Sequence, residues 1–258
     1  MGYSDLTIGI PVRIDSSDRM RNLIAIVQFF KEFDNITIIV LEADAKSVIQ
    51  DMNGVTRIFI EDSNPLYHKT KHIKELFDNT ATRFVGIWDS DVLVSKRMIE
   101  NAMNQLRANH ADMSIPYNGT VCMVTDPVLE SFLKRSKEVP PNVDFLLENQ
   151  KEMATYYGHH ACGGAYIVNK EKHFEAGGEN LKFTSWGPED LERYKRWEIC
   201  DMRVHRGSEP MFHLHHQRGS SWYVNEEIRH QLGLELIKTC RSTKEELVRR
   251  IIKQNNDL

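Results

Sequence analysis

Two aspartates, Asp89 and Asp91, stand on either side of one serine, directly after the apolar segment 84–88. That segment has the composition of a buried strand, and a buried carboxylate without a partner is energetically costly. A pair of carboxylates at a strand end suits a divalent cation, which one of them can bind while the other orients it or reaches a sugar hydroxyl. The plainer alternative is that one aspartate caps the following helix and the other is exposed, and the spacing alone does not decide between the two.

Three histidines, His213, His215 and His216, form a second cluster, on a predicted strand and its end. Imidazole is a good ligand for Mn²⁺ or Zn²⁺, so this cluster favours the metal-binding interpretation of the aspartates. The sequence contains no HExxH helix, which argues against a zinc enzyme of that type. His68 and His72 lack the glutamate of that motif, and we predict that they lie on the surface of a helix.

Short, continuous apolar segments alternate with amphipathic segments through the first 117 residues. This alternation predicts a parallel sheet covered by helices on both faces. The predicted strands span 6–12, 35–44, 55–62, 83–91 and 111–117, and the predicted helices span 16–33, 67–81 and 95–109, the first of them capped by Ser16 or Ser17. Ligands of such sheets bind at the carboxyl ends of the strands, which is where Asp89 and Asp91 lie.

The second half of the chain has a less regular pattern. Its predicted elements are two helical pieces separated by Pro140–Pro141, a strand, helix and glycine turn within 162–180, a loop and helix within 185–200, a strand and loop within 208–227, and a last helix that begins at a capping box of Ser242 and Glu245. The loop 217–226 is predicted to close over a bound donor, and an ordinary exposed connection is the alternative.

The composition limits the classes of partner. The 258 residues carry a formal net charge of −4, with 41% hydrophobic and 27% charged residues, as expected of a soluble globular protein. This balance provides no global basic field, so we expect no nucleic acid partner. With no signal-peptide pattern and no apolar run of ~18–20 residues, the sequence predicts a cytoplasmic protein without a transmembrane segment, for which peripheral association with the inner face of the membrane stays open.

A set of motifs in the second half resembles the carboxyl-half motif of the β-1,4-galactosyltransferases and of related inverting glycosyltransferases, bacterial family 2-type enzymes among them. The residues that match it in order and spacing are Gly163–Gly164, Phe174, Gly177–Gly178, Trp186–Gly187 and Glu189–Asp190. Upstream, Asp89 and Asp91 match the metal motif of that family, and Ile10–Arg13 resembles its first-strand motif with Val12 in place of Phe. Pro188 and Leu191 depart from the motif, since the family has Gly and Asp at these positions.

This resemblance implies the GT-A fold, an α/β fold with a Rossmann-like, mostly parallel central sheet, helices on both faces and a smaller acceptor-side half. The chain would form one continuous domain, with a nucleotide-sugar-binding half at 1–115 and an acceptor-binding and catalytic half at 116–258. The implied activity is transfer of a sugar, galactose or N-acetylgalactosamine, from a UDP-sugar to a saccharide acceptor, in cell-surface polysaccharide synthesis. The implied cofactor is Mn²⁺ or Mg²⁺.

The resemblance also assigns roles to residues. His216 looks like the metal-binding histidine of the family, and His213 occupies the position of a metal-binding methionine, so the implied ligands are Asp91, His213 and His216. The implied donor-binding residues are Pro11, Arg13, Asp44, Lys69, Asp89, Asp91, Gly164 and Arg218, and the implied acceptor-binding residues are Trp186, Gly187, Glu189 and Asp190. Asp190 would be the general base that takes the proton of the acceptor hydroxyl.

Several of these residues have plainer interpretations. The segment 185–193 would serve equally as an ordinary helix N-terminus, with acidic residues that favour the helix dipole. Arg13 could be a surface arginine, and Lys69 could be a solvated lysine on a helix. A nucleotidyltransferase is a rival enzyme class, but the segment after the first strand has no glycine for a phosphate loop. A carbohydrate-binding module without catalysis is hard to reconcile with the presence of Asp89, Asp91, Asp190 and His216.

Overall fold

A seven-stranded sheet forms the centre of the computed structural model, which describes the chain except for residues 1, 137–139, 186, 218–224 and 257–258. The strand order is β10-β6-β9-β4-β1-β2-β3. The bounds of these strands are β1 Leu6–Val12, β2 Thr37–Asp44, β3 Thr56–Glu61, β4 Phe84–Trp88, β6 Met113–Ile115, β9 Ala165–Asn169 and β10 Val204–Arg206. Residues of both predicted halves build this sheet, because β9 and β10 come from the second half; the division at residue 115 stays a prediction.

Most pairs in the large sheet are parallel, as predicted. Strand β1 runs parallel to β2 and β4, β2 to β3, and β6 to β10, while β9 is antiparallel to both of its neighbours, β4 and β6. Every residue of β1 and β4 is buried, which explains why the sequence of both strands is apolar without alternation. The carboxyl ends of β1, β2 and β4 therefore meet at one edge of the sheet.

The first-half helices lie close to the predicted ranges. They are α1 Ser17–Phe30, α2 Lys69–Asp78 and α3 Lys96–Arg107. The Ser16 side chain accepts a hydrogen bond from the Arg19 amide at 3.2 Å, which settles the choice between two predicted caps. His72 is fully buried on the face of α2 that also carries Ile73 and Leu76, so the predicted surface position of this histidine is wrong.

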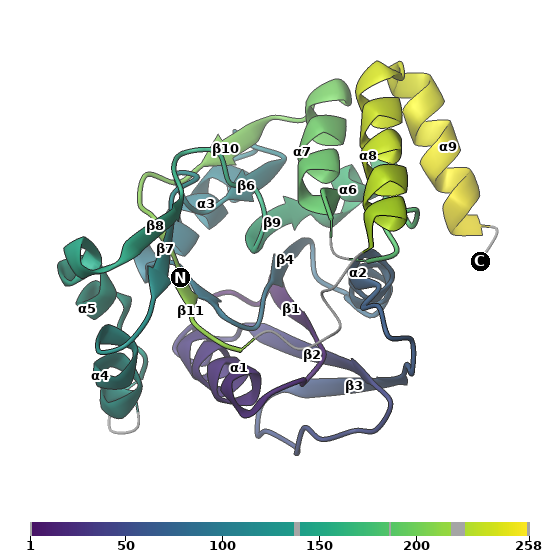
Figure 1. Ribbon diagram of the computed structural model, residues 1–258. Helices are drawn as coiled ribbons and strands as arrows, with labels where there is room; N and C mark the ends of the chain where they lie inside the picture. The colour runs from purple at the N-terminus through teal and green to yellow at the C-terminus, as the bar shows by residue number, and fades with distance from the viewer. Residues whose placement is uncertain (1, 137–139, 186, 218–224, 257–258) are drawn as a thin grey trace.

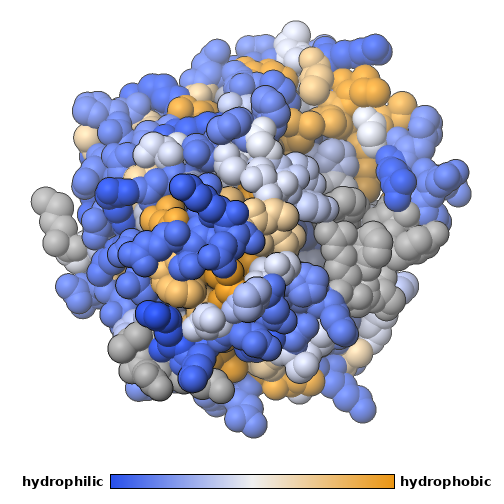
Figure 2. Space-filling view, turned by 60° about the vertical axis from the view of Figure 1, so that its left-hand side comes forward, coloured by the Kyte–Doolittle hydropathy of each residue, from blue (hydrophilic) through white to orange (hydrophobic). Residues whose placement is uncertain are grey.

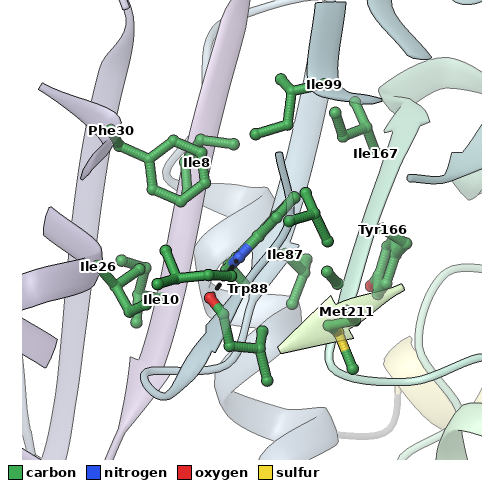
Figure 3. Close-up of a cluster of buried hydrophobic side chains, with 14 of the residues drawn as sticks. Ile8, Ile10, Ile26, Phe30, Ile87, Trp88, Ile99, Tyr166, Ile167 and Met211 are labelled. Atoms are coloured by element: carbon green, nitrogen blue, oxygen red, sulfur yellow. Dashed lines mark hydrogen bonds between the residues drawn. The ribbon is translucent and has the colours of Figure 1, made fainter. Parts of the chain in front are cut away.

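A cluster of large buried side chains surrounds β4 and includes residues of β1, β9, α1 and α3 (Figure 3). The indole of Trp88 meets the ring of Phe30 edge-on, with centroids 5.0 Å apart. Its Nε1 donates to the carbonyl oxygen of Val92 at 3.1 Å, and this bond spans the loop that contains Asp89 and Asp91. Packing of Trp88 in the core thus fixes the loop Asp89–Asp91, here called the aspartate loop.

A second, four-stranded sheet was not anticipated from the sequence. Its order is β5-β11-β7-β8, with bounds β5 Val92–Leu93, β11 Met211–Leu214, β7 Val121–Val124 and β8 Ala154–Tyr157. These strands have four residues or fewer, too short for a hydrophobic pattern to stand out. Only β11 falls in a predicted strand, and its pairing with β5 places the histidine segment directly beside the aspartate loop.

The remaining helices are α4 Val128–Arg135, α5 Val143–Glu148, α6 Lys170–Glu175, α7 Glu189–Ile199, α8 Glu226–Arg241 and α9 Lys244–Asn256, with a short 3₁₀ turn at Gln150–Glu152. Helices α7, α8 and α9 lie side by side (Figure 1). Helix α8 was not predicted. The predicted capping box is displaced by one residue, because Thr243 and Glu246 exchange the two side chain–amide bonds while the Ser242 hydroxyl bonds the Lys238 carbonyl at the end of α8.

The surface shows no single dominant apolar area in the view of Figure 2. Hydrophilic side chains cover most of that face, and hydrophobic residues gather in a few areas. Among the described residues, no helix is both long enough and apolar enough to span a membrane. The four cysteines are unpaired, and Cys122 and Cys200 are buried.

Candidate active site

A cavity of about 590 Å³ opens at the carboxyl edge of the large sheet. Its lining includes most of the predicted site residues: Pro11, Arg13, Lys69, Asp89, Asp91, Gly164, Gly187, Glu189, Asp190, His213 and His216. Asp44 is not part of the lining; its carboxylate accepts a bond from the Ala45 amide at 2.8 Å. Trp186 and Arg218, with most of the predicted lid 217–226, lie outside the described residues. The fold therefore brings the separate motifs into one cavity.

Main-chain hydrogen bonds hold the aspartate loop against two other segments. The Asp89 amide donates to the Gly164 carbonyl at 2.8 Å. The Leu214 amide donates to the Asp91 carbonyl at 2.7 Å. The glycine pair before β9 and the histidine strand β11 are thus fixed to the same loop, which explains how motifs more than 70 residues apart converge.

Asp91, His213 and His216 form a cluster whose ligand atoms all lie within 4.8 Å of one another. The Nε2 atom of His216 is 3.1 Å from Asp91 Oδ2, and the Nε2 atom of His213 is 3.7 Å from Asp91 Oδ1. His216 Nδ1 lies 2.8 Å from the Gln217 carbonyl oxygen, which can only accept, so Nδ1 carries a hydrogen. This is the usual way in which a backbone carbonyl orients a ligand histidine with Nε2 toward a metal. One carboxylate and two imidazoles suit a divalent transition metal such as Mn²⁺.

The ionisation of this cluster is set by its own members and by Arg19. Burial alone would raise the pKa of the Asp91 carboxyl, but His213, the hydrogen bond from His216 and the charge of Arg19 together hold that pKa below its ordinary value. Burial alone would lower the pKa of His216, but the hydrogen bond and charge of Asp91 raise it above the ordinary value. Asp91 is therefore an anion at neutral pH, which is the state that binds metal.

Arg19 is a member of the site that the sequence analysis missed. It lies in the first turn of α1, and its Nη1 donates to Asp91 Oδ2 at 3.1 Å. Its Nε donates to Asp15 Oδ1 at 2.9 Å. The available signal was its position: α1 follows β1, so its first turn lies at the same sheet edge as Asp91.

Lys69, the first residue of α2, lies between two carboxylates. Its Nζ is 2.8 Å from Asp89 Oδ1 and 3.9 Å from Asp190 Oδ2, and its side chain is only 16% exposed. The interpretation as a solvated helix lysine is therefore wrong. Burial alone would lower the pKa of Lys69, but Asp190 and Asp89 raise it well above its ordinary value. Lys69 is a fixed positive charge that links the aspartate loop to α7.

Asp190 is held by Arg193, one turn further along α7. Arg193 Nη1 donates to Asp190 Oδ1 at 2.7 Å, while its Nε and Nη2 bind both oxygens of Glu179 at 2.9 and 2.7 Å. Arg193 and Glu179 are fully buried. Burial alone would raise the pKa of Asp190, but Lys69 and Arg193 hold it below the ordinary value. Asp190 is thus an oriented anion with one oxygen directed toward the cavity lysine.

The pKa of Glu189 is shifted in the opposite direction to that of Asp190. Its side chain is buried, and its Oε2 accepts from the Gly187 amide at 3.0 Å. Burial, and then the charge of Asp190, raise the pKa of Glu189 to about 8. Adjacent carboxylates in α7 therefore differ at neutral pH: Asp190 is ionised and Glu189 carries a proton.

Arg13 ties neighbouring strand ends together. Its guanidinium donates to the carbonyl oxygens of Ala43, Asp62 and Asn64, and it pairs with the Asp62 carboxylate at 3.2 Å. It is therefore a well-bonded residue rather than a free surface arginine, although it lines the cavity.

The two glycines before β9, Gly163 and Gly164, are required because other side chains lie where a Cβ atom would be. A Cβ at Gly163 would lie 2.0 Å from Asp190 Oδ2. Gly164 has φ +82°, and a Cβ there would lie 2.9 Å from Met211 Cε. Gly163 thus gives Asp190 its space, and Gly164 allows the turn that accepts the Asp89 amide.

Replacing Gly163 by alanine should displace Asp190 and break its contacts with Lys69 and Arg193. We expect the free energy of unfolding to fall by about 1–3 kcal/mol, the usual cost of overpacking. Urea denaturation would measure it. Gly158→Ala is the matched control from the same segment, because a Cβ there meets nothing within 4 Å; equal effects of the two substitutions would contradict the steric argument.

The raised pKa of Glu189 predicts a pH-dependent stability difference. The proton on Glu189 stabilises the folded state, so this contribution is complete below the unfolded value of about 4.5 and is lost as pH rises through about 8. Relative to Glu189→Gln, the wild-type protein should therefore lose stability between pH 5 and pH 8.5, at about 1.4 kcal/mol for each unit of pKa difference. Urea denaturation at the two pH values tests this, and parallel behaviour of the two proteins would refute it.

Comparison with known proteins provides an independent test. A family model described as the N-terminal domain of galactosyltransferase matches residues 145–217. The fold resembles glucosyl-3-phosphoglycerate synthase from Mycobacterium tuberculosis, solved with Mn²⁺, UDP and glucosyl-3-phosphoglycerate: the TM-score is 0.54 at 11% identity, over 91% of this chain and 79% of that chain. The complex of the same synthase with Mn²⁺, UDP and phosphoglyceric acid gives a TM-score of 0.54 at 12% sequence identity, over 92% of this chain and 78% of that chain.

No curated protein sequence matches the chain. The matched family segment includes the glycine pair, Glu189, Asp190 and the histidine pair His213 and His216, but not Asp91. Asp91 lies outside the matched segment, but the fold places its carboxylate beside His213 and His216. The partial family match and the shared fold together confirm the prediction of a glycosyltransferase with the GT-A fold.

Proposed function

We propose that this glycosyltransferase is metal-dependent and inverting, and that it moves a sugar from a UDP-sugar to a saccharide acceptor. One observation carries the proposal: a cluster that could hold a metal ion and an oriented, ionised carboxylate, Asp190, face the same cavity, where Lys69 lies between Asp89 and Asp190. The presence of Mn²⁺ and UDP in the similar synthase supports this choice of donor and metal. Galactose or N-acetylgalactosamine is the sugar that the motif resemblance favours, and synthesis of cell-surface polysaccharide is the role we propose.

The donor side consists of Asp91, His213 and His216, which would hold the cation. A divalent cation bound there would offset the charge that the diphosphate gains as the glycosidic bond breaks. Asp89 is held by the Lys69 ammonium and lies next to the metal ligands in the loop. Burial, and then Asp91 and Asp190, raise the pKa of Asp89, although Lys69 opposes this. The ion pair with Lys69 favours the carboxylate form of Asp89, which would accept a hydrogen bond from a donor hydroxyl.

The acceptor side consists of Asp190 and the residues that hold it. A general base must be ionised, oriented and open to the substrate. Arg193 orients one carboxylate oxygen, and the side chain remains 26% exposed toward the cavity. Glu189 is buried and protonated, so Asp190 rather than Glu189 is the base in this proposal. Attack from the Asp190 side, opposite the diphosphate, would invert the configuration at the anomeric carbon.

The metal assignment predicts a graded loss of nucleotide binding. Asp91→Ala should abolish the Mn²⁺-dependent part of UDP binding, because it removes the anionic ligand, and His216→Ala should weaken it. Isothermal titration calorimetry with and without Mn²⁺ measures both. His215→Ala is the control, since this side chain is exposed and outside the cluster. Unchanged Mn²⁺-dependent binding by Asp91→Ala would show that the cation binds elsewhere.

The base assignment predicts that Asp190→Asn separates binding from transfer. The amide keeps the shape but cannot take a proton, so transfer should fall roughly 10²–10⁴-fold while UDP and Mn²⁺ still bind. The test first identifies the donor by UDP release from a panel of UDP-sugars with Mn²⁺, then measures transfer at saturating donor and acceptor. Glu198→Gln, an exposed acid at the other end of α7, is the control. A product of retained anomeric configuration by NMR, or near wild-type transfer by Asp190→Asn, would overturn the assignment.

A further inference from the structure

Arg19 makes a contact that a bound cation would oppose. Its Nη1 donates to Asp91 Oδ2, the same oxygen that lies 3.1 Å from His216 Nε2. Its Nη2 lies 3.4 Å from His216 Nδ1. Because that Nδ1 donates to the Gln217 carbonyl, it cannot accept from Arg19, and the contact brings two donors together. The guanidinium therefore reaches both an anionic and an imidazole member of the cluster.

Arg19 is placed where its guanidinium can bind either Asp91 or a ligand in the cavity. The side chain is about one-fifth exposed and lines the cavity, on the same side as Asp91. Its Nε is held by Asp15, which leaves the outer part of the guanidinium on Asp91. A guanidinium binds a phosphate in the same forked way as a carboxylate, so a diphosphate in this cavity would offer Arg19 an equivalent partner.

We propose that Arg19 is a built-in cation that competes with the divalent metal for Asp91 and is transferred to the diphosphate when the nucleotide binds. This inference rests on the proposed function, because it needs the metal and the UDP-sugar to share the cavity. Arg19 compensates the buried Asp91 carboxylate in the metal-free protein, and it repels a cation that binds alone. The diphosphate relieves this repulsion, so metal and nucleotide bind cooperatively.

The proposal predicts opposite effects of one substitution on two affinities. Arg19→Gln should bind Mn²⁺ alone at least about 10-fold more tightly, because a nearby positive charge is removed. The same variant should bind UDP in saturating Mn²⁺ roughly 10–100-fold more weakly, because a charged hydrogen bond to the diphosphate is lost. A residue that only supports the fold would weaken both. By linkage, the factor by which UDP tightens Mn²⁺ binding should fall in the variant.

The experiment is a titration of Mn²⁺, followed by the electron paramagnetic resonance signal of the free ion, and a calorimetric titration of UDP in saturating Mn²⁺. Arg21→Gln is the matched control: Arg21 lies on the same helix and pairs with Asp18 and with the His215 carbonyl outside the cavity. Both affinities of this control should stay within about twofold of the wild type, the small effect expected of a surface pair.

A second variant keeps the test decisive if Arg19→Gln does not fold. Arg19→Lys retains the charge but loses the fork, so Mn²⁺ alone should bind as in the wild type while UDP with Mn²⁺ binds more weakly. Unchanged or weaker Mn²⁺ binding by Arg19→Gln, or tighter Mn²⁺ binding by Arg19→Lys, would overturn the role of Arg19. Failure of the wild-type protein to bind Mn²⁺, or binding that survives Asp91→Ala, would instead overturn the proposed metal site.

Discussion

The burial of the Asp91 carboxylate is the constraint on which the arrangement of the site depends. A buried anion must be compensated, and the compensating groups come from opposite ends of the chain: Arg19 from α1, and His213 and His216 from β11 and the segment after it. The amide of Leu214 also bonds the carbonyl of Asp91. One short loop at the end of β4 therefore joins the first helix to the last strand of the small sheet.

A second cluster balances charge in a different way. Lys69 contacts Asp89 and Asp190, and Arg193 contacts Asp190 and Glu179. A fourth acid, Glu189, is buried beside Asp190. Four carboxylates around two cations would leave excess negative charge in a buried region, and a proton on Glu189 relieves part of it. This balance keeps Asp190 ionised while its neighbour in α7 is neutral. The difference between the two adjacent residues comes from burial and contacts rather than from residue type.

The sequence predicted the part of this site that local patterns encode. The apolar run of β4 gives Asp89 and Asp91 their place at a strand end, and the spacing of Gly163, Gly164 and Asp190 predicts a family motif. It did not single out Arg19 or Arg193, because ordinary helical spacing does not show which charged residue near the start of a helix bonds a carboxylate of the site. The small sheet and α8 were also missed, since two- to four-residue strands and a helix with a weak apolar face leave little periodic signal. The position of His72 was predicted wrongly for another reason: it is a polar residue on the buried face of α2, and a polar residue in an amphipathic pattern is expected at the surface.

The candidate metal ligands, Asp91, His213 and His216, and the proposed base depend on different parts of the fold. Asp91 and the histidines are fixed by β4, β5 and β11, whereas Asp190 is fixed by packing around α7. Gly187 lies so close to α8 that a Cβ there would be 2.6 Å from Leu232, and Thr239 of α8 bonds Glu192 of α7 at 3.0 Å. Changes at the contact between α7 and α8 would therefore move Asp190 relative to the metal cluster without altering the ligands themselves. Because Lys69 contacts both Asp89 and Asp190, a shift of Asp190 would also change the contact between Lys69 and Asp89.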